Sequence, residues 1–225
     1  MKQVSTLLGP MWVHDADHLG QVLSTGVFWD GQLQQYLDQA PPGTLVVDVG
    51  ANVGFISRYM AQKGHPVIAV EAWPDTVILL RMNTEGLPVS IIEGVAYDRY
   101  LIFTLAPAAL LGWEPSPCSP NVSSYAFLPD WWHGTIPGVV LDNYIQCDTK
   151  VGLIKVDAQG CDLRALRGLR STILRDRPLI LFEFEAAASS WQGDVWEDYL
   201  LFFKHLNYEV ERVREDIWDY VATPR

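Results

Sequence analysis

Residues 46–57, with the sequence VVDVGANVGFIS, constrain the fold of this chain more than any other segment. Valines interrupted only by Asp48 predict a buried strand, and the residues after them predict a tight turn that leads into a helix near Phe55. Gly50 would let the backbone turn where a side chain would clash. Gly54 would let the new helix approach a ligand closely. A strand, turn and helix in this order predict a cradle for a nucleotide-type cofactor.

The glycine spacing in this turn differs from the fingerprint of dinucleotide-binding folds. That fingerprint has glycines at its first, third and sixth positions, which here are Gly50, Asn52 and Phe55. A nicotinamide oxidoreductase is therefore disfavoured, because a pyrophosphate would fit this turn badly. The spacing Asp-x-Gly-Ala-Asn-x-Gly-Phe instead resembles the first motif of S-adenosylmethionine-dependent, class I methyltransferases, in a form close to that of the FkbM-type family.

This resemblance implies an α/β fold of the class I methyltransferase type. Such a fold is a Rossmann-like, doubly wound sheet, here expected to carry a C-terminal antiparallel hairpin and an inserted hairpin or lid. The resemblance also implies S-adenosyl-L-methionine as the cofactor and S-adenosyl-L-homocysteine as the product. Asp48 and the glycine turn are then expected to face the amino-acid end of the cofactor. The residues expected to bind the cofactor are Asp48, Gly50, Ala51, Asn52, Gly54, Phe55, Glu71, Ala72, Ala96 and Trp29.

Glu71 is the expected ribose-binding residue. It closes a predicted strand at residues 67–70 and falls about 20 residues after the glycine turn, where a carboxylate commonly accepts the hydroxyls of a ribose. A carboxylate at a strand end could instead cap the next helix, which is predicted at residues 74–83. The resemblance to FkbM-type enzymes continues through residues 69–74, because the strand is followed by Glu and then by Pro.

A second buried strand is predicted within residues 151–160, VGLIKVDAQG. Alternation places Lys155 and Asp157 on one face of this strand together with Leu153. A lysine inside a hydrophobic strand needs a charged partner. In the usual methyltransferase sheet this strand lies between the first strand and the strand at residues 179–184, and ligands bind at the carboxyl ends of such strands. The residues expected to meet at that edge are Asp48, Lys155, Asp157 and Glu183.

Residues 154–168, IKVDAQGCDLRALRG, resemble the second motif of the FkbM-type family, which is roughly Lys, apolar, Asp, any residue, Glu, Gly. Gln159 stands where the family usually has Glu, and Asp162 stands where a second Glu is common. If the family's Glu accepts the proton, Gln159 cannot replace it. Another group must then serve as the base, or the activity is lost.

Three residues are candidates for that base. Asp157 is the first choice, although it could instead form a structural ion pair with Lys155. Glu183 lies on the neighbouring strand. His133 is the second choice, but a lone histidine in a loop could equally be a solvated residue. The catalytic candidates are therefore Asp157, Lys155, Glu183 and His133.

The length of 225 residues predicts a single domain over residues 1–225. Residues 1–40 form a preface expected to lie over the cofactor, since the sequence Val-Phe-Trp-Asp at residues 27–30 resembles the segment that does so in FkbM-type enzymes. Phe28 and Trp29 could equally cap the core. Residues 107–138, rich in proline and tryptophan, predict an irregular lid. The other expected elements are helices at 31–39, 56–63, 162–175 and 195–206, strands at 89–93 and 100–105, a loop at 186–193, and a hairpin of 208–213 and 217–221.

The charge of the chain disfavours nucleic acid as a partner, because a formal net charge of −11 and a pI of about 4.7 repel a phosphate backbone. No apolar run reaches the roughly 18 residues of a membrane span, and no secretory signal opens the sequence, which predicts a cytoplasmic protein without a membrane partner. Three cysteines without paired metal-type spacing predict free thiols and no metal site.

The expected function is an S-adenosylmethionine-dependent O-methyltransferase, since the resemblance implies methylation of oxygen atoms on small molecules of natural-product or sugar-like type. The aromatic lid favours a partly hydrophobic acceptor. Two alternatives remain. An RNA ribose methyltransferase uses similar lysine and acidic residues but needs a basic track. A catalytically silent cofactor-binding partner protein would explain Gln159. The sequence indicates neither the acceptor nor the oligomeric state.

Overall fold

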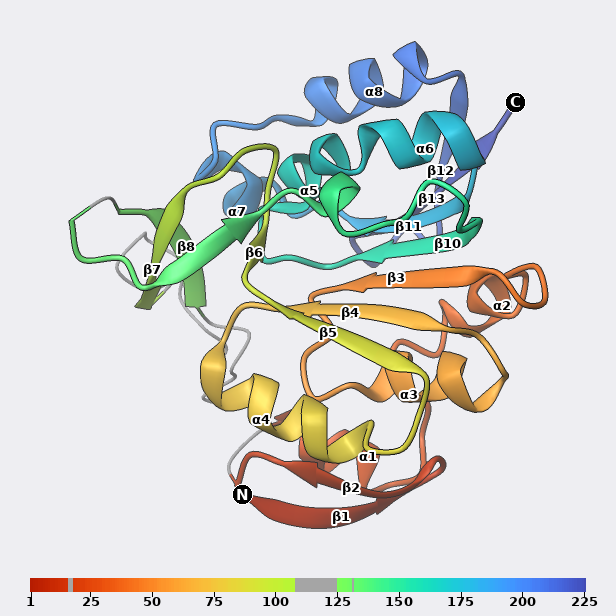
Figure 1. The fold of residues 1–225 in the computed structure, drawn as a ribbon, viewed down its shortest axis with the longest axis vertical. Helices are drawn as coiled ribbons and strands as arrows, with labels where there is room; N and C mark the ends of the chain where they lie inside the picture. Colours follow the sequence, from red (N-terminus) through yellow and green to blue (C-terminus); the bar gives the residue numbers. More distant parts are fainter. Residues whose placement is uncertain (16–17, 108–124, 131) are drawn as a thin grey trace.

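A seven-stranded sheet forms the centre of the protein in the computed structural model, which describes residues 1–15, 18–107, 125–130 and 132–225 (Figure 1). The strand order is β12-β13-β11-β10-β3-β4-β5. β13 is antiparallel to both of its neighbours, and the other pairings are parallel. This order, with a C-terminal antiparallel hairpin, confirms the predicted sheet. The strands are β3 (Leu45–Val49), β4 (Val67–Glu71), β5 (Val89–Glu93), β10 (Val151–Val156), β11 (Leu179–Glu183), β12 (Tyr208–Arg212) and β13 (Asp219–Pro224).

Helices cover both faces of this sheet because its central strands are apolar on both sides. β3 illustrates the alternation, since Val46 packs into one hydrophobic cluster and Val47 and Val49 into the other. In Figure 1 the helices of the C-terminal half lie on one face and those of the N-terminal half on the opposite face. The first group is α5 (Asp162–Gly168), α6 (Arg170–Asp176) and α8 (Trp196–His205), and the second is α1 (His18–Leu23), α2 (Gln34–Leu37), α3 (Phe55–Gln62) and α4 (Pro74–Asn83).

The N-terminal segment contains a hairpin that the sequence did not predict, formed by β1 (Lys2–Thr6) and β2 (Gly9–Val13). Asn83 at the end of α4 fastens this hairpin. Its side chain accepts a hydrogen bond from the Trp12 N–H at 2.7 Å and donates one to the Trp12 carbonyl at 2.8 Å. The same amide group donates to the Val53 carbonyl at 2.8 Å, so the hairpin is tied directly to the glycine turn.

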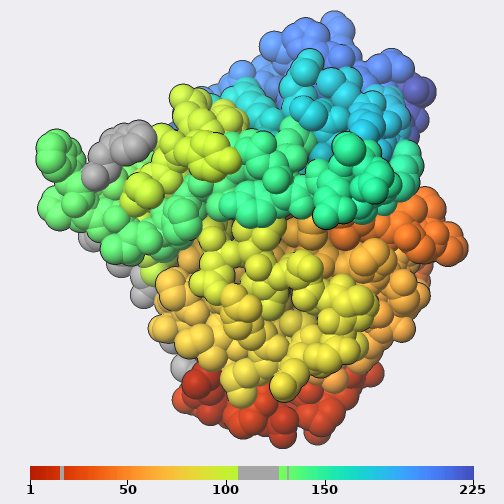
Figure 2. Space-filling view, viewed as in Figure 1, coloured from red at the N-terminus to blue at the C-terminus, as the bar shows by residue number. Residues whose placement is uncertain are grey.

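A second, four-stranded sheet lies beside the central one, in the order β6-β9-β7-β8. Its strands are β6 (Val95–Ala96), β7 (Ile102–Pro107), β8 (Tyr125–Pro129) and β9 (Ile136–Val139). The space-filling view in Figure 2 shows this region, in yellow-green and green, projecting from one side of the molecule. β7 agrees with the extra strand expected at 100–105, and its pairing with β8 agrees with the expected inserted hairpin. The expected irregular lid at 107–138 is wrong in its described part, because β8 and most of β9 are strands that pair with β7. Much of the predicted lid, including Trp113, and also Cys118 and Trp131, lies outside the described residues.

Three predicted elements differ from the structure. The helix expected at 162–175 is two helices, because the carboxylate of Asp142 accepts the N–H groups of Ser171 and Thr172 at 2.8 and 2.9 Å and so starts a new helix at that point. The loop expected at 186–193 begins with the short helix α7 (Ala186–Ser190), whose alanines favour helix. The helix expected at 31–39 is restricted to α2, since Asp30 has a positive φ of 52° and a turn follows it.

Candidate active site

A cleft opens at the carboxyl ends of β3, β4 and β10. The space among its lining residues, open solvent included, amounts to about 1080 Å³. Its lining combines apolar side chains with a few polar groups. The lining residues are Leu19, Trp29, Val49, Gly50, Ala51, Asn52, Val53, Phe55, Ile56, Val70, Glu71, Ala72, Trp73, Thr76, Gly94, Val95, Ala96, Phe127, Lys155, Asp157, Ala158 and Gln159.

The turn after β3 forms the floor of this cleft. Gly50 has a φ of 72°, and a Cβ at that position would lie 1.8 Å from the carbonyl oxygen of Asp157. The N–H groups of Gly50 and Ala51 both donate to the Val70 carbonyl, at 2.9 and 3.0 Å. Glycine is therefore required here for two reasons, the left-handed backbone and the close approach of β10. Gly54, which begins α3 with a φ of 89°, packs against Leu80 and is not part of the cleft wall.

Glu71 joins the turn after β3 to the turn after β4. Its Oε2 accepts the Asn52 N–H at 2.8 Å, and its Oε1 accepts the N–H groups of Ala72 and Trp73 at 2.9 and 2.8 Å. Burial raises the pKa of this carboxyl, while the three backbone donors favour the charged form. The lone pairs that these donors leave free can accept further hydrogen bonds from a ligand in the cleft.

Lys155 lies at the centre of the charged groups. Its Nζ is 3.3 Å from the Gly50 carbonyl, 3.4 Å from Oδ2 of Asp157 and 3.8 Å from Oδ1 of Asp48. Burial lowers the pKa of Lys155, but the two carboxylates outweigh burial and hold the pKa above its usual range. The expected grouping of Asp48, Lys155 and Asp157 is therefore present.

Asp48 and Asp157 occupy different positions in this group. Asp48 is completely buried, accepts a hydrogen bond from Ser57 Oγ at 2.6 Å, and lies behind the cleft wall instead of facing the space where a cofactor would bind. The side chain of Asp157 is 33% exposed and lines the cleft. Asp157 thus both pairs with Lys155 and offers an oxygen to a ligand.

A row of carboxylates extends from Asp157 across the neighbouring strands. Val156 is in register with Phe182, so Asp157 and Glu183 are the next residues along adjacent parallel strands. Glu183 is in turn paired with Asp219 on β13. Burial and the carboxylates of Asp157, Asp162 and Asp219 raise the pKa of Glu183 well above its usual value. Glu183 itself is not part of the cleft wall.

Asp30 of the N-terminal segment adds a fourth carboxylate to this row. Burial and the nearby Asp157 raise the pKa of Asp30 to about 7. The adjacent Gln32 donates from Nε2 to Oδ2 of Asp219 at 3.2 Å, which fixes the segment against β13. Sequence reasoning missed Asp30 and Asp219. Asp30 directly follows Trp29 in a segment already identified, whereas only the register of β13 against β11 indicates Asp219.

The loop between β10 and α5 holds Gln159 at the cleft with a φ of 51°. Asp162 closes this loop, because its carboxylate accepts the N–H groups of Ala158 and Gly160, each at 3.1 Å. Burial and Asp157 raise the pKa of Asp162 to about 7. Asp162 is 2% exposed and its carboxylate is occupied by these two loop N–H groups. It therefore supports the shape of the loop and does not contact a substrate.

His133 does not reach the cleft. Its side chain is 86% exposed, with Nδ1 3.6 Å from Oδ2 of Asp130, and its own N–H donates to Asp130 Oδ1 at 3.0 Å. The prediction of His133 as a second candidate base is therefore not supported, and its short loop is organised by Asp130. Trp73, Thr76 and Phe127 line the cleft but were not predicted.

Three further expectations concern metal sites, cysteines and membrane spans. Within the described ranges, no three His, Cys, Asp or Glu residues are arranged to hold a metal ion. Cys147 is exposed and Cys161 is buried, both as free thiols. Nor does any helix in the described part of the chain have the length and apolar character that crossing a membrane requires.

Comparison with solved structures identifies the class of the fold. The crystal structure of a TehB-like S-adenosylmethionine-dependent methyltransferase from Corynebacterium glutamicum matches with a TM-score of 0.50 and 15% sequence identity, over 91% of this chain and 93% of that chain. At this identity the likeness concerns the fold alone. Together with the strand order, it defines a class I, Rossmann-like methyltransferase fold.

One family model matches part of the sequence. Residues 135–210 match the methyltransferase FkbM domain. An FkbM methyltransferase from Methylobacillus flagellatus has a TM-score of 0.48 and 18% identity, over 80% of this chain and 43% of that chain, and this score adds no weight to the assignment. No curated protein matches the chain in sequence. The match over residues 135–210 agrees with the expected resemblance to the FkbM-type family in this part of the chain.

Proposed function

We propose that the protein transfers the methyl group of S-adenosylmethionine to a hydroxyl group of a small molecule, with Asp157 as the proton acceptor. The observation that carries this proposal is the position of Asp157, whose carboxylate lines the cleft next to the Gly50 turn and is paired with Lys155 at 3.4 Å. It is the one carboxylate besides Glu71 among the described residues of the cleft wall.

The two carboxylates that line the cleft suit two different roles, one in binding the cofactor and one in accepting the proton. Glu71 would accept the ribose hydroxyls, since it lies where class I enzymes place that residue and is already oriented by three backbone donors. Gly50, Ala51 and Asn52 would border the amino-acid end of the cofactor. Asp157 is in contact with this turn through Gly50, and it would therefore face the methyl group.

The chemistry requires little from the protein beyond placement. The sulfonium carries an activated methyl group, so the acceptor oxygen forms the new C–O bond as the S–C bond breaks and S-adenosylhomocysteine leaves. The hydroxyl proton passes to Asp157, a contribution of about 100-fold to 10,000-fold in typical enzymes. Lys155 would hold the Asp157 carboxylate toward the acceptor.

The surrounding charges favour an uncharged or cationic acceptor. Asp30, Glu183 and Asp219 lie near Asp157 and interact with it electrostatically. An anionic acceptor would add a further negative charge beside carboxyl groups whose pKa values are already raised by their mutual repulsion, which disfavours the phosphate backbone of an RNA. The apolar side chains of Trp29 and Phe127 would contact a partly hydrophobic acceptor.

A methyl-transfer assay tests this proposal. The protein would be incubated with S-adenosylmethionine labelled in the methyl group and a panel of hydroxylated small molecules, each with its O-methyl ether as a matched control. Label transfer to the hydroxyl compound alone, reduced about 100-fold or more in Asp157→Asn, supports the proposal, and Asp130→Asn serves as a control variant outside the cleft. Cofactor binding without S-adenosylhomocysteine formation from any acceptor would favour the silent partner protein. Transfer to nitrogen would contradict O-methylation.

A further inference from the structure

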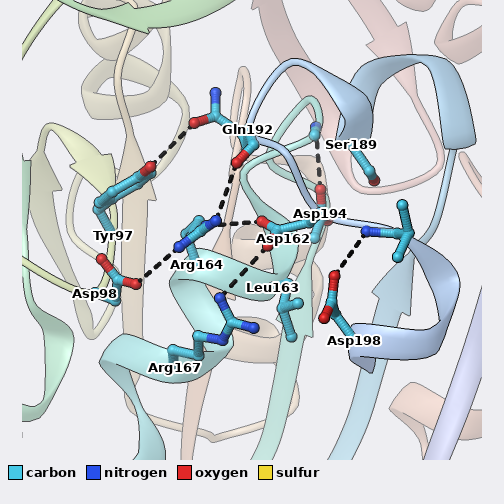
Figure 3. A network of polar contacts seen from close by, with 12 residues as sticks. Tyr97, Asp98, Asp162, Leu163, Arg164, Arg167, Ser189, Gln192, Asp194 and Asp198 are labelled. Atoms are coloured by element: carbon cyan, nitrogen blue, oxygen red, sulfur yellow. Dashed lines mark hydrogen bonds and ion pairs between the residues drawn. The ribbon is translucent and has the colours of Figure 1, made fainter. Parts of the chain in front are cut away.

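The side-chain amide of Gln192 bridges two segments that each contribute a residue to the cleft lining. Its Oε1 accepts a hydrogen bond from the Tyr97 hydroxyl at 3.0 Å, as Figure 3 shows. Its Nε2 donates to the carbonyl oxygen of Phe127 at 3.1 Å. Ala96, which directly precedes Tyr97, and Phe127 both line the cleft. A single residue far from both in the sequence therefore connects them.

Gln192 is itself held in place by Arg164 on α5. The main-chain carbonyl of Gln192 accepts a hydrogen bond from Arg164 Nη2 at 2.9 Å, and its N–H donates to the Ser189 carbonyl at 3.0 Å. The same guanidinium pairs with Asp194 at 2.7 Å and with Asp98 at 3.3 Å (Figure 3). The Asp194 side chain is 2% exposed and that of Arg164 is 16% exposed, so these pairs are shielded from water.

The contact of Gln192 with Phe127 holds β8 from outside its own sheet. β8 lies at the edge of its four-stranded sheet and pairs with β7. In that pairing Phe127 is opposite Leu105, and the Gln192 amide binds the Phe127 carbonyl from a different part of the chain. The Phe127 side chain belongs to a small hydrophobic cluster with Val95 and Tyr97, against which Ala72 packs. The position of Phe127 thus affects the wall beside the Glu71 turn.

We infer that Gln192 is a positioning residue that holds Phe127 against the cleft and thereby sets the affinity for the cofactor. Gln192 does not line the cleft, so it acts through Phe127 and the segment that contains Ala96. A rigid wall costs less conformational entropy when the ligand binds than a mobile one does. The inference concerns the cofactor and does not depend on the acceptor proposed above.

Calorimetric titration with S-adenosylhomocysteine tests this role without any turnover. Gln192→Leu removes both side-chain hydrogen bonds and is expected to raise Kd about tenfold. Gln192→Glu is the second variant: it keeps an acceptor for Tyr97 but places an oxygen against the Phe127 carbonyl, and we expect a change in the same direction. Arg81→Gln, on the exposed surface away from this network, serves as a control for nonspecific effects.

A double-mutant cycle separates a positioning role from a merely structural one. If Gln192 acts through Phe127, then Phe127→Ala raises Kd and the double variant Gln192→Leu, Phe127→Ala is no weaker than Phe127→Ala alone. A structural role predicts a lower Tm for Gln192→Leu with an unchanged Kd. That result, or additive losses in the cycle, would overturn the inference.

Discussion

The carbonyl oxygen of Asp157 occupies the space that a side chain at residue 50 would need. A Cβ at Gly50 would lie 1.8 Å from that oxygen, well inside any real contact distance. The turn that is expected to hold the cofactor and the residue that is expected to accept the proton are thus in direct contact. Methyl transfer depends on the relative placement of cofactor and acceptor, and under the proposed roles this contact would help to set it.

Gly50→Ala should therefore abolish cofactor binding and destabilise the protein by about 3 kcal/mol or more, because the backbone of two central strands must separate. Gly43→Ala is a matched control. Gly43 has nearly the same φ, 74° against 72°, but a Cβ there meets nothing within 4 Å. The control should cost about 1 to 2 kcal/mol from backbone strain alone. Thermal unfolding and titration with S-adenosylhomocysteine measure both effects, and equal losses in the two variants would refute the argument.

Glu71→Ala is expected to weaken S-adenosylmethionine binding by about 2 kcal/mol or more, roughly 30-fold, because the carboxylate proposed to accept the ribose hydroxyls is lost. Glu93→Ala is the control, since Glu93 is the residue in register with Glu71 on β5 and forms an exposed pair with Arg81. Calorimetry with S-adenosylmethionine and, in parallel, with NAD measures the effect. Undiminished binding to the Glu71 variant would exclude the ribose role.

Lys155→Met should destabilise the fold by about 3 to 5 kcal/mol, because removing one partner leaves buried carboxylates unpaired. Adding Asp48→Asn should recover part of this loss, since a neutral amide at this completely buried position needs no cation. Denaturant unfolding of the single and double variants gives the comparison. If Asp48→Asn brings no recovery, the Lys155 charge is not needed to balance Asp48.

Asp30 gives the protein a specific dependence on pH. Because its folded-state pKa of about 7 lies above the ordinary value of 3.8, the folded state binds the proton more tightly. The resulting stability is fully present below pH 3.8 and is lost as pH rises through 7. Asp30→Asn should stabilise the protein more at pH 8 than at pH 5, by a difference on the order of 1 to 3 kcal/mol, because an asparagine has no proton to lose between these two pH values.

The choice of asparagine keeps the shape of the side chain and tolerates the φ of 52° at this position. Unfolding curves of the two proteins at pH 5 and pH 8 are the measurement. A difference that is the same at both pH values would show that the effect does not come from the charge on Asp30.

The elements that follow the glycine turn could be predicted because the residues that start and end them are close together in the sequence. The predicted helix 74–83 and strand 89–93 agree with α4 and β5 residue for residue. Pro74 favours the first turn of a helix, and the apolar strands are bounded by residues that break them. The N-terminal hairpin could not be predicted in this way, since β2 is fastened by Asn83, 71 residues further along the chain from Trp12.

The site residues also differ in how far local sequence signals predict them. Gly50, Glu71 and Asp157 follow strands whose ends are legible in the sequence, and the structure brings all three to the cleft. Their chemical roles remain predictions. Asp48 and Glu183 were placed on the correct strands but lie outside the cleft wall, because alternation gives the face of a strand and not the depth of burial. The sequence did not indicate Gln192, because its hydrogen bonds to Tyr97 and Phe127 join residues far apart in the chain.

The position of β13 has a consequence for how the molecule assembles. β12 precedes β13 in the chain, but its pairing within the sheet is with β13, which separates it from β11. During synthesis, β12 therefore has no edge to join until β13 has emerged and docked. Asp219, the first residue of β13, arrives at the same step and completes the row of carboxylates. The group of carboxylates beside Asp157 is therefore complete only when the last strand of the described fold is in place.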